Sequence, residues 1–315
     1  MKFRDYKQKL KYKNVVEARL YDLTNSEFKN NIILNTYSKI SNCRNVTYKI
    51  KCKNCGNEYF LGSNSCNNRF CPICAKKRSL KYLATLLPAF EEYLKLGHSV
   101  HLVTLTMENT YNFMEGLEKI YSAFRYMTHQ NNYYARIFKY MFVGGVKSLE
   151  IIKGVSNNET YHSHLHLLVI KKRFTRDYEF LKQMWNNSLN FVYGTTNMKI
   201  GSVHLKQVKN PNNKSNKQSM IDIRTGLLET VKYITKIEDI FEYEDKMLSD
   251  FITYSHNKRY ISVFGLFAKY AKALNEEINE SEKDQVGKIC KVCGCSEFEF
   301  RQEYTSLIGS LDDFN

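Results

Sequence analysis

The stretch that decides the fold is His162-Ser-His-Leu-His166, followed at once by the apolar run Leu167-Leu-Val-Ile170. The apolar run predicts a buried strand. In a strand, side chains two residues apart share a face and lie about 6.6 Å from each other. His164 and His166 can therefore bind one metal ion. His162 lies about 13 Å from His166 in a regular strand, so we expect it outside the ligand set.

A partner strand is expected at residues 146–152, and it carries Glu150. The polar segment Ser156-Asn-Asn-Glu159 separates it from the histidine strand, a pattern typical of a β-hairpin. Glu150 would then complete the metal site, unless it faces solvent on the outer side of its strand. The remaining pattern predicts strands at 100–107 and 202–208, and helices at 112–140, 174–190, 260–278 and from Thr225 onward.

The nine cysteines fall into two groups, with six between Cys43 and Cys74. Two C-x-x-C pairs indicate a structural zinc site, because each pair supplies adjacent corners of a tetrahedron. Cys66 can replace Cys52 in that site, so four ligands are expected among Cys52, Cys55, Cys66, Cys71 and Cys74. The later trio of Cys290, Cys293 and Cys295 cannot close a four-ligand site alone. Its fourth ligand would come from the N-terminal set or a partner chain, or the trio binds no metal.

Charge and aromatic content suit a nucleic-acid partner. Lys and Arg number 47 against 32 Asp and Glu, giving a net charge of +15, with 23 Tyr and 19 Phe. Basic side chains neutralise phosphates and aromatic rings stack on unpaired bases. An AT-rich genome would inflate Lys and Tyr as well. The run Lys76-Lys77-Arg78 opens an expected helix and is a candidate phosphate contact, although a solvated helix face is equally compatible.

The amino terminus has no apolar core of signal-peptide type, and no stretch approaches the roughly 20 apolar residues that cross a bilayer. We therefore expect a cytoplasmic protein with no membrane partner. In a reducing compartment, cysteines serve metal binding more often than disulfides.

Glu229, Tyr233 and Lys236 lie on one side of the helix expected from Thr225, opposite its apolar side. Glu229 and Tyr233 are four residues apart, which places their Cβ atoms about 6 Å from each other in a helix. Taken alone, such a stripe is usually a solvated helix face.

In their order along the chain, these motifs resemble the HUH endonucleases, and among them the single-tyrosine initiators of plasmid rolling-circle replication. The resemblance covers residues 52–272. It is carried by Leu102-Val-Thr-Leu-Thr106, His162-Ser-His-Leu-His-Leu167 and Glu229-Thr-Val-Lys-Tyr233-Ile-Thr-Lys236. The flanking segments also resemble that family, namely Cys66-Asn-Asn-Arg-Phe-Cys71-Pro-Ile-Cys74 with Arg78, and Lys258-Arg259 leading to Gly265-Leu-Phe267.

The resemblance implies an α+β fold with a central antiparallel sheet of HUH endonuclease type, flanked by helices and preceded by a cysteine-rich zinc-binding segment. We expect four regions along the chain. They are a basic helical segment at 1–42, a zinc-binding segment at 43–78, the endonuclease domain at 79–278, and a linker with a cysteine-containing tail at 279–315.

The resemblance also implies roles for the site residues. Tyr233 would attack a DNA phosphate and remain attached to it as a 5′-phosphotyrosine, with Lys236 stabilising the developing charge. Glu229 would activate water to end replication. A Mg²⁺ or Mn²⁺ ion held by His164, His166 and Glu150 would polarise the phosphate. Candidate DNA contacts are Lys76, Lys77, Arg78 and Lys232.

The expected substrate is single-stranded or hairpin origin DNA. The sequence has no Gly-x-x-x-x-Gly-Lys-Ser/Thr phosphate loop, so unwinding would fall to a host helicase within the replication machinery. One alternative is an HUH transposase or mobilisation relaxase. Relaxases often coordinate metal through three histidines, so His162 in the metal shell would favour that alternative. A second alternative is a zinc-dependent DNA-binding protein without catalysis.

Overall fold

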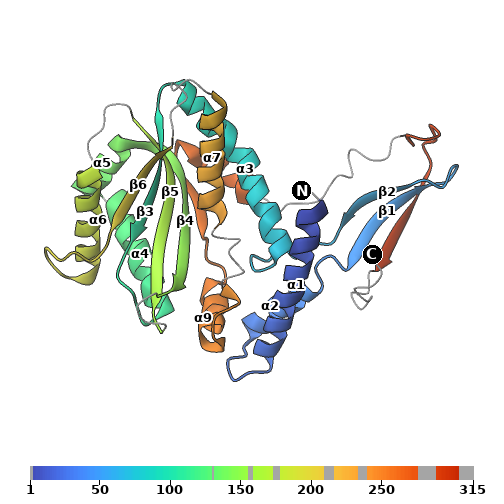
Figure 1. The fold of residues 1–315 in the computed structure, drawn as a ribbon, viewed down its shortest axis with the longest axis horizontal. Coiled ribbons are helices and arrows are strands. Elements are labelled where there is room, and N and C mark those ends of the chain that lie inside the picture. Colours follow the sequence, from blue (N-terminus) through green and yellow to red (C-terminus); the bar gives the residue numbers. More distant parts are fainter. Residues whose placement is uncertain are drawn as a thin grey trace.

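The computed structural model describes residues 3–129, 131–154, 159–172, 178–208, 216–232, 240–275 and 289–304 (Figure 1). They form two antiparallel sheets with surrounding helices, which confirms the predicted α+β class. The helices are α1 Phe3–Thr24, α2 Asn31–Ser41, α3 Pro72–Lys95, α4 Phe113–Thr128, α5 Tyr133–Met141, α6 Tyr178–Tyr193, α7 Asn216–Lys232, α9 Asp245–Ser255, η1 Leu266–Tyr270 and α10 Ala271–Asn275.

The larger sheet has the strand order β6-β3-β5-β4-β7, and each neighbouring pair is antiparallel. Its strands are β3 Ser99–Thr106, β4 Phe142–Lys153, β5 Tyr161–Lys171, β6 Val203–Val208 and β7 Ile261–Gly265. Strands β4 and β5 pair along their length from Phe142/Lys171 to Lys153/Tyr161. The predicted hairpin is therefore present, and the histidine strand is the middle strand of the sheet.

The two faces of this sheet are covered by different helices. Side chains of one alternation, including Val103, Leu149, Leu165 and Leu167, are buried with apolar residues of α4 and α6. Those of the other alternation, including Leu168, are buried with residues of α3 and α7. We call the second surface the α3/α7 face. Figure 1 shows α7 and α3 on the same side of the sheet.

The helix expected at 112–140 is two helices, α4 and α5. Asn132 ends the continuity because its side chain accepts a hydrogen bond from the Ala135 N–H and caps α5. The helix expected at 260–278 is wrong at its start, where β7 pairs with the edge of β4. Gly265 then turns the chain with φ of +60°, and a Cβ there would lie 2.3 Å from the Val143 carbonyl oxygen.

The smaller sheet joins distant parts of the chain. Its order is β2-β1-β8, with β1 Val46–Cys52, β2 Glu58–Ser63 and β8 Phe298–Tyr304. Figure 1 shows it beside α1, apart from the larger sheet, with β8 lying next to β1. In the part of the chain that the structure describes, no helix is long and apolar enough to cross a membrane.

Candidate metal centres

The first candidate site lies at one end of the α3/α7 face, where Glu150 of β4 meets His164 and His166 of β5. Glu150 and His164 are directly paired in the register of the hairpin. The Glu150 Oε2 atom lies 2.9 Å from His166 Nε2 and 3.5 Å from His164 Nδ1. The structure thus brings together the three side chains that the hairpin pattern grouped, with their ligand atoms within 4.8 Å of one another.

The chemistry of this group fits a divalent cation. Two imidazoles and a carboxylate form a ligand set of nitrogen and oxygen donors that transition metals such as Mn²⁺ accept. Thr104 Oγ1 lies 3.1 Å from His166 Nδ1 and orients the ring so that Nε2 faces Glu150. His164 Nε2 is buried and has no hydrogen-bond partner among the described residues. An unpaired buried nitrogen is costly unless a ligand or ion satisfies it.

His162 lies outside this group. Its Nδ1 atom is 2.6 Å from Asn109 Oδ1, and its ring centroid is 4.3 Å from that of His164. Burial lowers the pKa of His162, and the neighbouring His164 lowers it further, so the neutral ring is favoured. The third member of the group is therefore a carboxylate and not a third histidine.

Helix α7 lies across the same face. A Cβ at Gly226 would lie 3.3 Å from Leu168 Cδ1, so this side of the helix meets the sheet. Leu168 follows His166 by two residues, and their side chains share a face. Glu229 is half-buried, one helical turn after Gly226. Tyr233, directly after the last residue of α7, and Lys236 lie outside the described residues.

The second candidate site is a cluster of Cys43, Cys66, Cys71 and Cys74, in which all but Cys66 are buried. The Cys74 sulfur lies 3.6 Å from those of Cys43 and Cys66, and the Cys71 sulfur lies 3.8 Å from that of Cys43. A zinc–sulfur tetrahedron with bonds of about 2.3 Å has edges of about 3.8 Å. Disulfide sulfurs would be about 2.05 Å apart. The four thiols therefore have the spacing of a zinc site.

The loop that contains Cys66 and Cys71 also contacts α9 and the residue that precedes β7. Phe70 packs edge to face on Phe251, with ring centroids 6.1 Å apart. The Arg69 guanidinium lies 4.6 Å from the ring centre of Tyr260. The Tyr260 carbonyl in turn accepts a hydrogen bond of 2.8 Å from the N–H of Leu149, next to Glu150. The cluster is thus connected to the strand that bears the carboxylate.

The expected single zinc site differs from the observed grouping. Cys52 and Cys55 do not join the cluster around Cys74 but converge with Cys290 and Cys293. The C-x-x-C spacing defines each pair and carries no information on which pairs meet in space. Cys43 is a ligand candidate that was not predicted, because it has no second cysteine at C-x-x-C spacing in the sequence. The contact of Thr104 with His166 was not predicted either, although Thr104 belongs to the Thr-Leu-Thr motif of the strand that pairs with the histidine strand.

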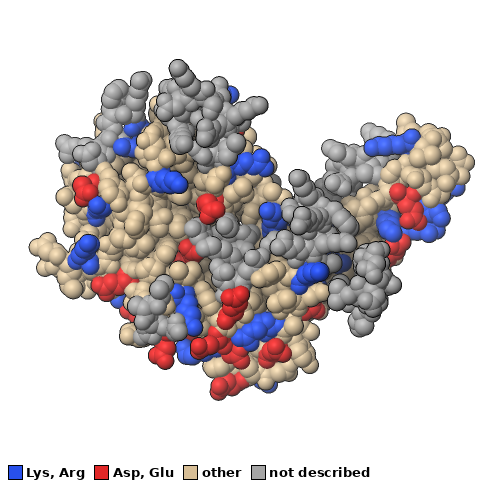
Figure 2. All heavy atoms as spheres, viewed as in Figure 1, with Lys and Arg blue, Asp and Glu red and all other residues tan. Residues whose placement is uncertain are grey.

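The basic residues predicted to contact DNA lie on two helices, α3 and α7. Lys76, Lys77 and Arg78 lie in the first two turns of α3 and are partly buried. Arg78 Nη2 donates to the Asn67 carbonyl at 2.6 Å, so it supports the cysteine loop. Lys232 is the last residue of α7. Figure 2 shows Lys and Arg intermixed with Asp and Glu on the face that it displays.

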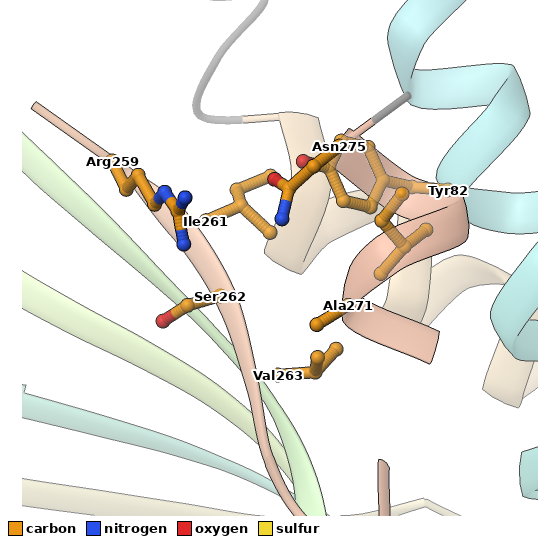
Figure 3. Close-up of a pocket in the computed structure, with 8 residues that line it drawn as sticks. Tyr82, Arg259, Ile261, Ser262, Val263, Ala271 and Asn275 are labelled. Carbon is orange, nitrogen blue, oxygen red and sulfur yellow. The ribbon is translucent and has the colours of Figure 1, made fainter. Parts of the chain in front are cut away.

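A separate small cavity of about 70 Å³ lies between β7, α10 and α3. Its lining includes Ile261 and Val263 of β7 with Tyr82 of α3, and Arg259 stands at the start of the strand (Figure 3). None of the metal-site residues lines it. The cavity is too small to hold a DNA strand.

The fold and the site together define an α+β protein with a two-histidine, one-carboxylate group on its central antiparallel sheet and four-cysteine clusters nearby. Residues 59–302 match the model of the family described as "Replication protein". Because the match spans well over half of the chain, the chain belongs to the replication protein family. The family predicted from the motifs is confirmed.

Three curated relatives share the name "Protein rep". The relative from Staphylococcus aureus is 25% identical over 222 residues, which cover 68% of this chain and 88% of the relative. The relative from Lentilactobacillus hilgardii is 28% identical over 233 residues, 67% of each chain. The relative from Streptococcus pneumoniae is 25% identical over 226 residues, 66% of this chain and 63% of the relative. No solved structure gives a significant match.

Proposed function

We propose that this chain is a cytoplasmic initiator of plasmid rolling-circle replication, of HUH endonuclease type, that nicks one strand of origin DNA. The observation that carries the proposal is the group of Glu150, His164 and His166 on the sheet face that α7 covers. Tyr233 directly follows α7 in the sequence, seven residues after Gly226. Membership of the replication protein family supports the same reading.

The proposed first step is a transesterification. The phenolic oxygen of Tyr233 forms a bond to the phosphorus of the scissile phosphodiester, and the bond from phosphorus to the 3′ oxygen breaks. The phenolic proton ends on the departing 3′ oxygen. The products are a 5′-phosphotyrosine and a free 3′ hydroxyl, which can prime synthesis. The reaction exchanges one phosphodiester bond for another and does not hydrolyse it. The 3′ hydroxyl can therefore later attack the phosphotyrosine and rejoin the strand.

Bound Mg²⁺ or Mn²⁺ would supply Lewis-acid polarisation of the phosphate oxygens. His164, His166 and Glu150 would hold the ion, and Thr104 would fix the ring of His166 through its hydroxyl. Lys236 would stabilise negative charge that develops on the phosphate. Cys43, Cys66, Cys71 and Cys74 would hold a structural zinc ion, since four thiolates fill all four positions of a tetrahedral ion and leave none for a substrate.

Glu229 would end the reaction. Its carboxylate accepts a proton from water, the water oxygen forms a bond to a phosphorus of the origin strand, and the bond from that phosphorus to the 3′ oxygen breaks. The proton passes from Glu229 to the departing 3′ oxygen, and no second covalent link traps the enzyme on DNA. Lys76, Lys77, Arg78 and Lys232 would contact the DNA backbone. The substrate would be single-stranded or hairpin origin DNA, unwound by a host helicase.

The alternatives have less support. A relaxase or transposase of the same superfamily would share the chemistry, but the third member of the metal group is Glu150, while His162 lies against Asn109. A DNA-binding protein without catalysis would have no need of a buried carboxylate between two imidazoles on a sheet face.

The test is a covalent-capture assay. Wild-type protein with Mn²⁺ and a labelled single-stranded origin oligonucleotide is expected to give an adduct that survives denaturation. Tyr233→Phe should abolish the adduct. Tyr140→Phe is the matched control, because Tyr140 is exposed on α5 and should leave the adduct unchanged. An adduct in Tyr233→Phe, or none in wild type across candidate origins, would overturn the assignment.

Glu229→Gln tests the second role. The substitution keeps the size of the side chain and removes its ability to accept a proton. We expect normal first cleavage with defective release, measured as adduct that persists after the strand-transfer step. Equal loss of both steps would show that Glu229 is structural.

A further inference from the structure

Four cysteines from opposite ends of the described chain meet at the smaller sheet. Cys52 is the last residue of β1 and Cys55 follows it, whereas Cys290 and Cys293 precede β8. The Cys52 sulfur lies 3.5 Å from that of Cys293, and the Cys55 sulfur lies 3.5 Å from that of Cys290. These distances are close to the edge of a zinc–sulfur tetrahedron and far from a disulfide.

The two pairs share the pattern Cys-Lys-x-Cys-Gly and a backbone hydrogen bond from the glycine to the first cysteine. The segments are Cys52-Lys-Asn-Cys55-Gly56 and Cys290-Lys-Val-Cys293-Gly294. The Gly56 N–H donates to the Cys52 carbonyl and the Gly294 N–H to the Cys290 carbonyl, each at 2.9 Å. Both glycines have positive φ, +73° and +74°, which favours glycine over other residues.

A second hydrogen bond completes each turn. The N–H of Cys52 donates to the carbonyl of Asn57 at 2.9 Å, and the N–H of Cys290 donates to the carbonyl of Cys295 at 2.7 Å. Each segment is thus a tight knuckle that presents two thiols. The Cys71–Cys74 pair is different, because it opens helix α3 and lacks the glycine. Two copies of one knuckle facing each other form a four-thiolate cage.

A side chain of the sheet supports this cage. The Tyr59 hydroxyl lies 3.2 Å from the Cys290 sulfur and accepts a hydrogen bond of 2.9 Å from the Lys291 N–H. A phenol in this position can donate to a thiolate, which is the arrangement that orients and stabilises metal ligands. Cys295 is not part of the cage, since its sulfur accepts the Glu297 N–H at 3.3 Å.

The smaller sheet needs such a support. Its three strands contain seven, six and seven residues, and β8 pairs only with β1 in this sheet. Phe60, Phe300 and Tyr304 remain more than half exposed, so the sheet buries little apolar surface. Sheets of this size are rarely stable without a metal or disulfide. Its charges are also nearly balanced by ion pairs such as Lys49–Glu303, which disfavours a role in binding phosphates.

We infer that Cys52, Cys55, Cys290 and Cys293 bind a structural zinc ion that closes β1, β2 and β8 into a zinc ribbon. The ion ties the segment before the endonuclease core to the segment after it. Cys55 and Cys293 are exposed, whereas Cys71 and Cys74 of the other cluster are buried. A chelator therefore reaches the ribbon zinc first. This site stands independently of the nicking activity proposed above.

The first test is the zinc content of the purified full-length chain by mass spectrometry. Cys290→Ser and Cys293→Ser should each contain one zinc ion fewer than wild type. Cys295→Ser is the matched control and should equal wild type. The inference fails if Cys290→Ser retains the wild-type zinc content, or if Cys295→Ser loses as much zinc as Cys290→Ser.

The second test avoids substitutions that can impair folding. Wild-type protein is exposed briefly to a chelator, and amide hydrogen exchange is then measured by mass spectrometry. We expect loss of one zinc ion and faster exchange in β1, β2 and β8, with β3, β4 and β5 unchanged. Loss of zinc with uniform acceleration across both sheets would overturn the inference, and so would unchanged exchange in β8.

Discussion

The two faces of the central sheet are built by alternate residues of the same strands, yet they differ in what they bury. The face under α4 and α6 carries an unbroken apolar run in the second half of β5, namely Leu165, Leu167 and Val169. On the α3/α7 face, Leu168 and Ile170 are apolar, but His166 and His164 follow toward the start of the strand. Helices α4 and α6 thus bury this apolar run on one face. The other face changes along β5 from an apolar core to a polar site.

The difference shows how a metal group is placed in a protein interior. Leu168 packs under α7, and two residues away His166 is only 8% exposed but has polar partners on both ring nitrogens. The apolar half of the face packs against α7, and the polar half carries the candidate metal ligands. Buried polar groups are tolerated when they are satisfied, so Thr104 and Glu150 make this position for His166 possible.

The largest expected effect comes from His166→Ala. Removing one of three candidate ligands should weaken Mn²⁺ binding and reduce covalent adduct formation about 1,000-fold or more, since polarisation of a phosphoryl oxygen contributes several kcal/mol. The measurements are Mn²⁺ binding by electron paramagnetic resonance and the adduct assay. The unfolding temperature should change little.

Leu167→Ala is the matched control, one residue along the strand and on the opposite face. Folded Leu167→Ala protein should bind Mn²⁺ and cleave DNA like wild type. Equal loss of ion binding by both variants, at a temperature where both are folded, would contradict the assignment of ion binding to the α3/α7 face alone.

The sequence predicts local pairing well and long-range pairing poorly. His164, His166 and Glu150 were grouped from a period of two and one polar turn, because a hairpin couples residues that are close in sequence. One of the two partners of β1 is β8, about 250 residues away, and no periodicity encodes that pairing. The repeated Cys-Lys-x-Cys-Gly segment was the available signal for it.

The start of the helix expected at 260–278 was predicted wrongly for a similar reason. Ile261 and Val263 form a strand because the edge of β4 offers free hydrogen-bonding groups, which is a tertiary effect that overrides local preference. The grouping of cysteines failed for the same reason. Spacing determines which two thiols form a pair, whereas the fold determines which pairs meet.

A smaller effect concerns stability and contrasts Leu167 with Ser148. Leu167→Ala leaves a cavity on the closed face and should reduce the free energy of unfolding by about 2 to 5 kcal/mol. Ser148 lies beside His166 on the α3/α7 face, fully buried, and its hydroxyl has no partner among the described residues. Ser148→Ala should therefore be neutral or stabilising, by about 1 kcal/mol. Urea unfolding measures both, and a clear destabilisation by Ser148→Ala would contradict the contrast.

The smallest expected effect comes from a threonine that acts through His166. Thr104→Val keeps the shape of the side chain and removes the hydroxyl that lies 3.1 Å from His166 Nδ1. Residues that hydrogen-bond to a metal ligand typically contribute about 10- to 100-fold in metal affinity. For Thr104→Val we expect the low end of that range, a loss of Mn²⁺ affinity of roughly tenfold. Thr106→Val is the control, since the Thr106 hydroxyl is engaged with Ser202: it lies 2.7 Å from Ser202 Oγ and accepts the Ser202 N–H at 3.1 Å. Equal affinities for Thr104→Val and wild type would mean that packing alone orients His166. Weakening by both variants alike would mean that the polar half of the face responds as one unit, without a specific role for Thr104.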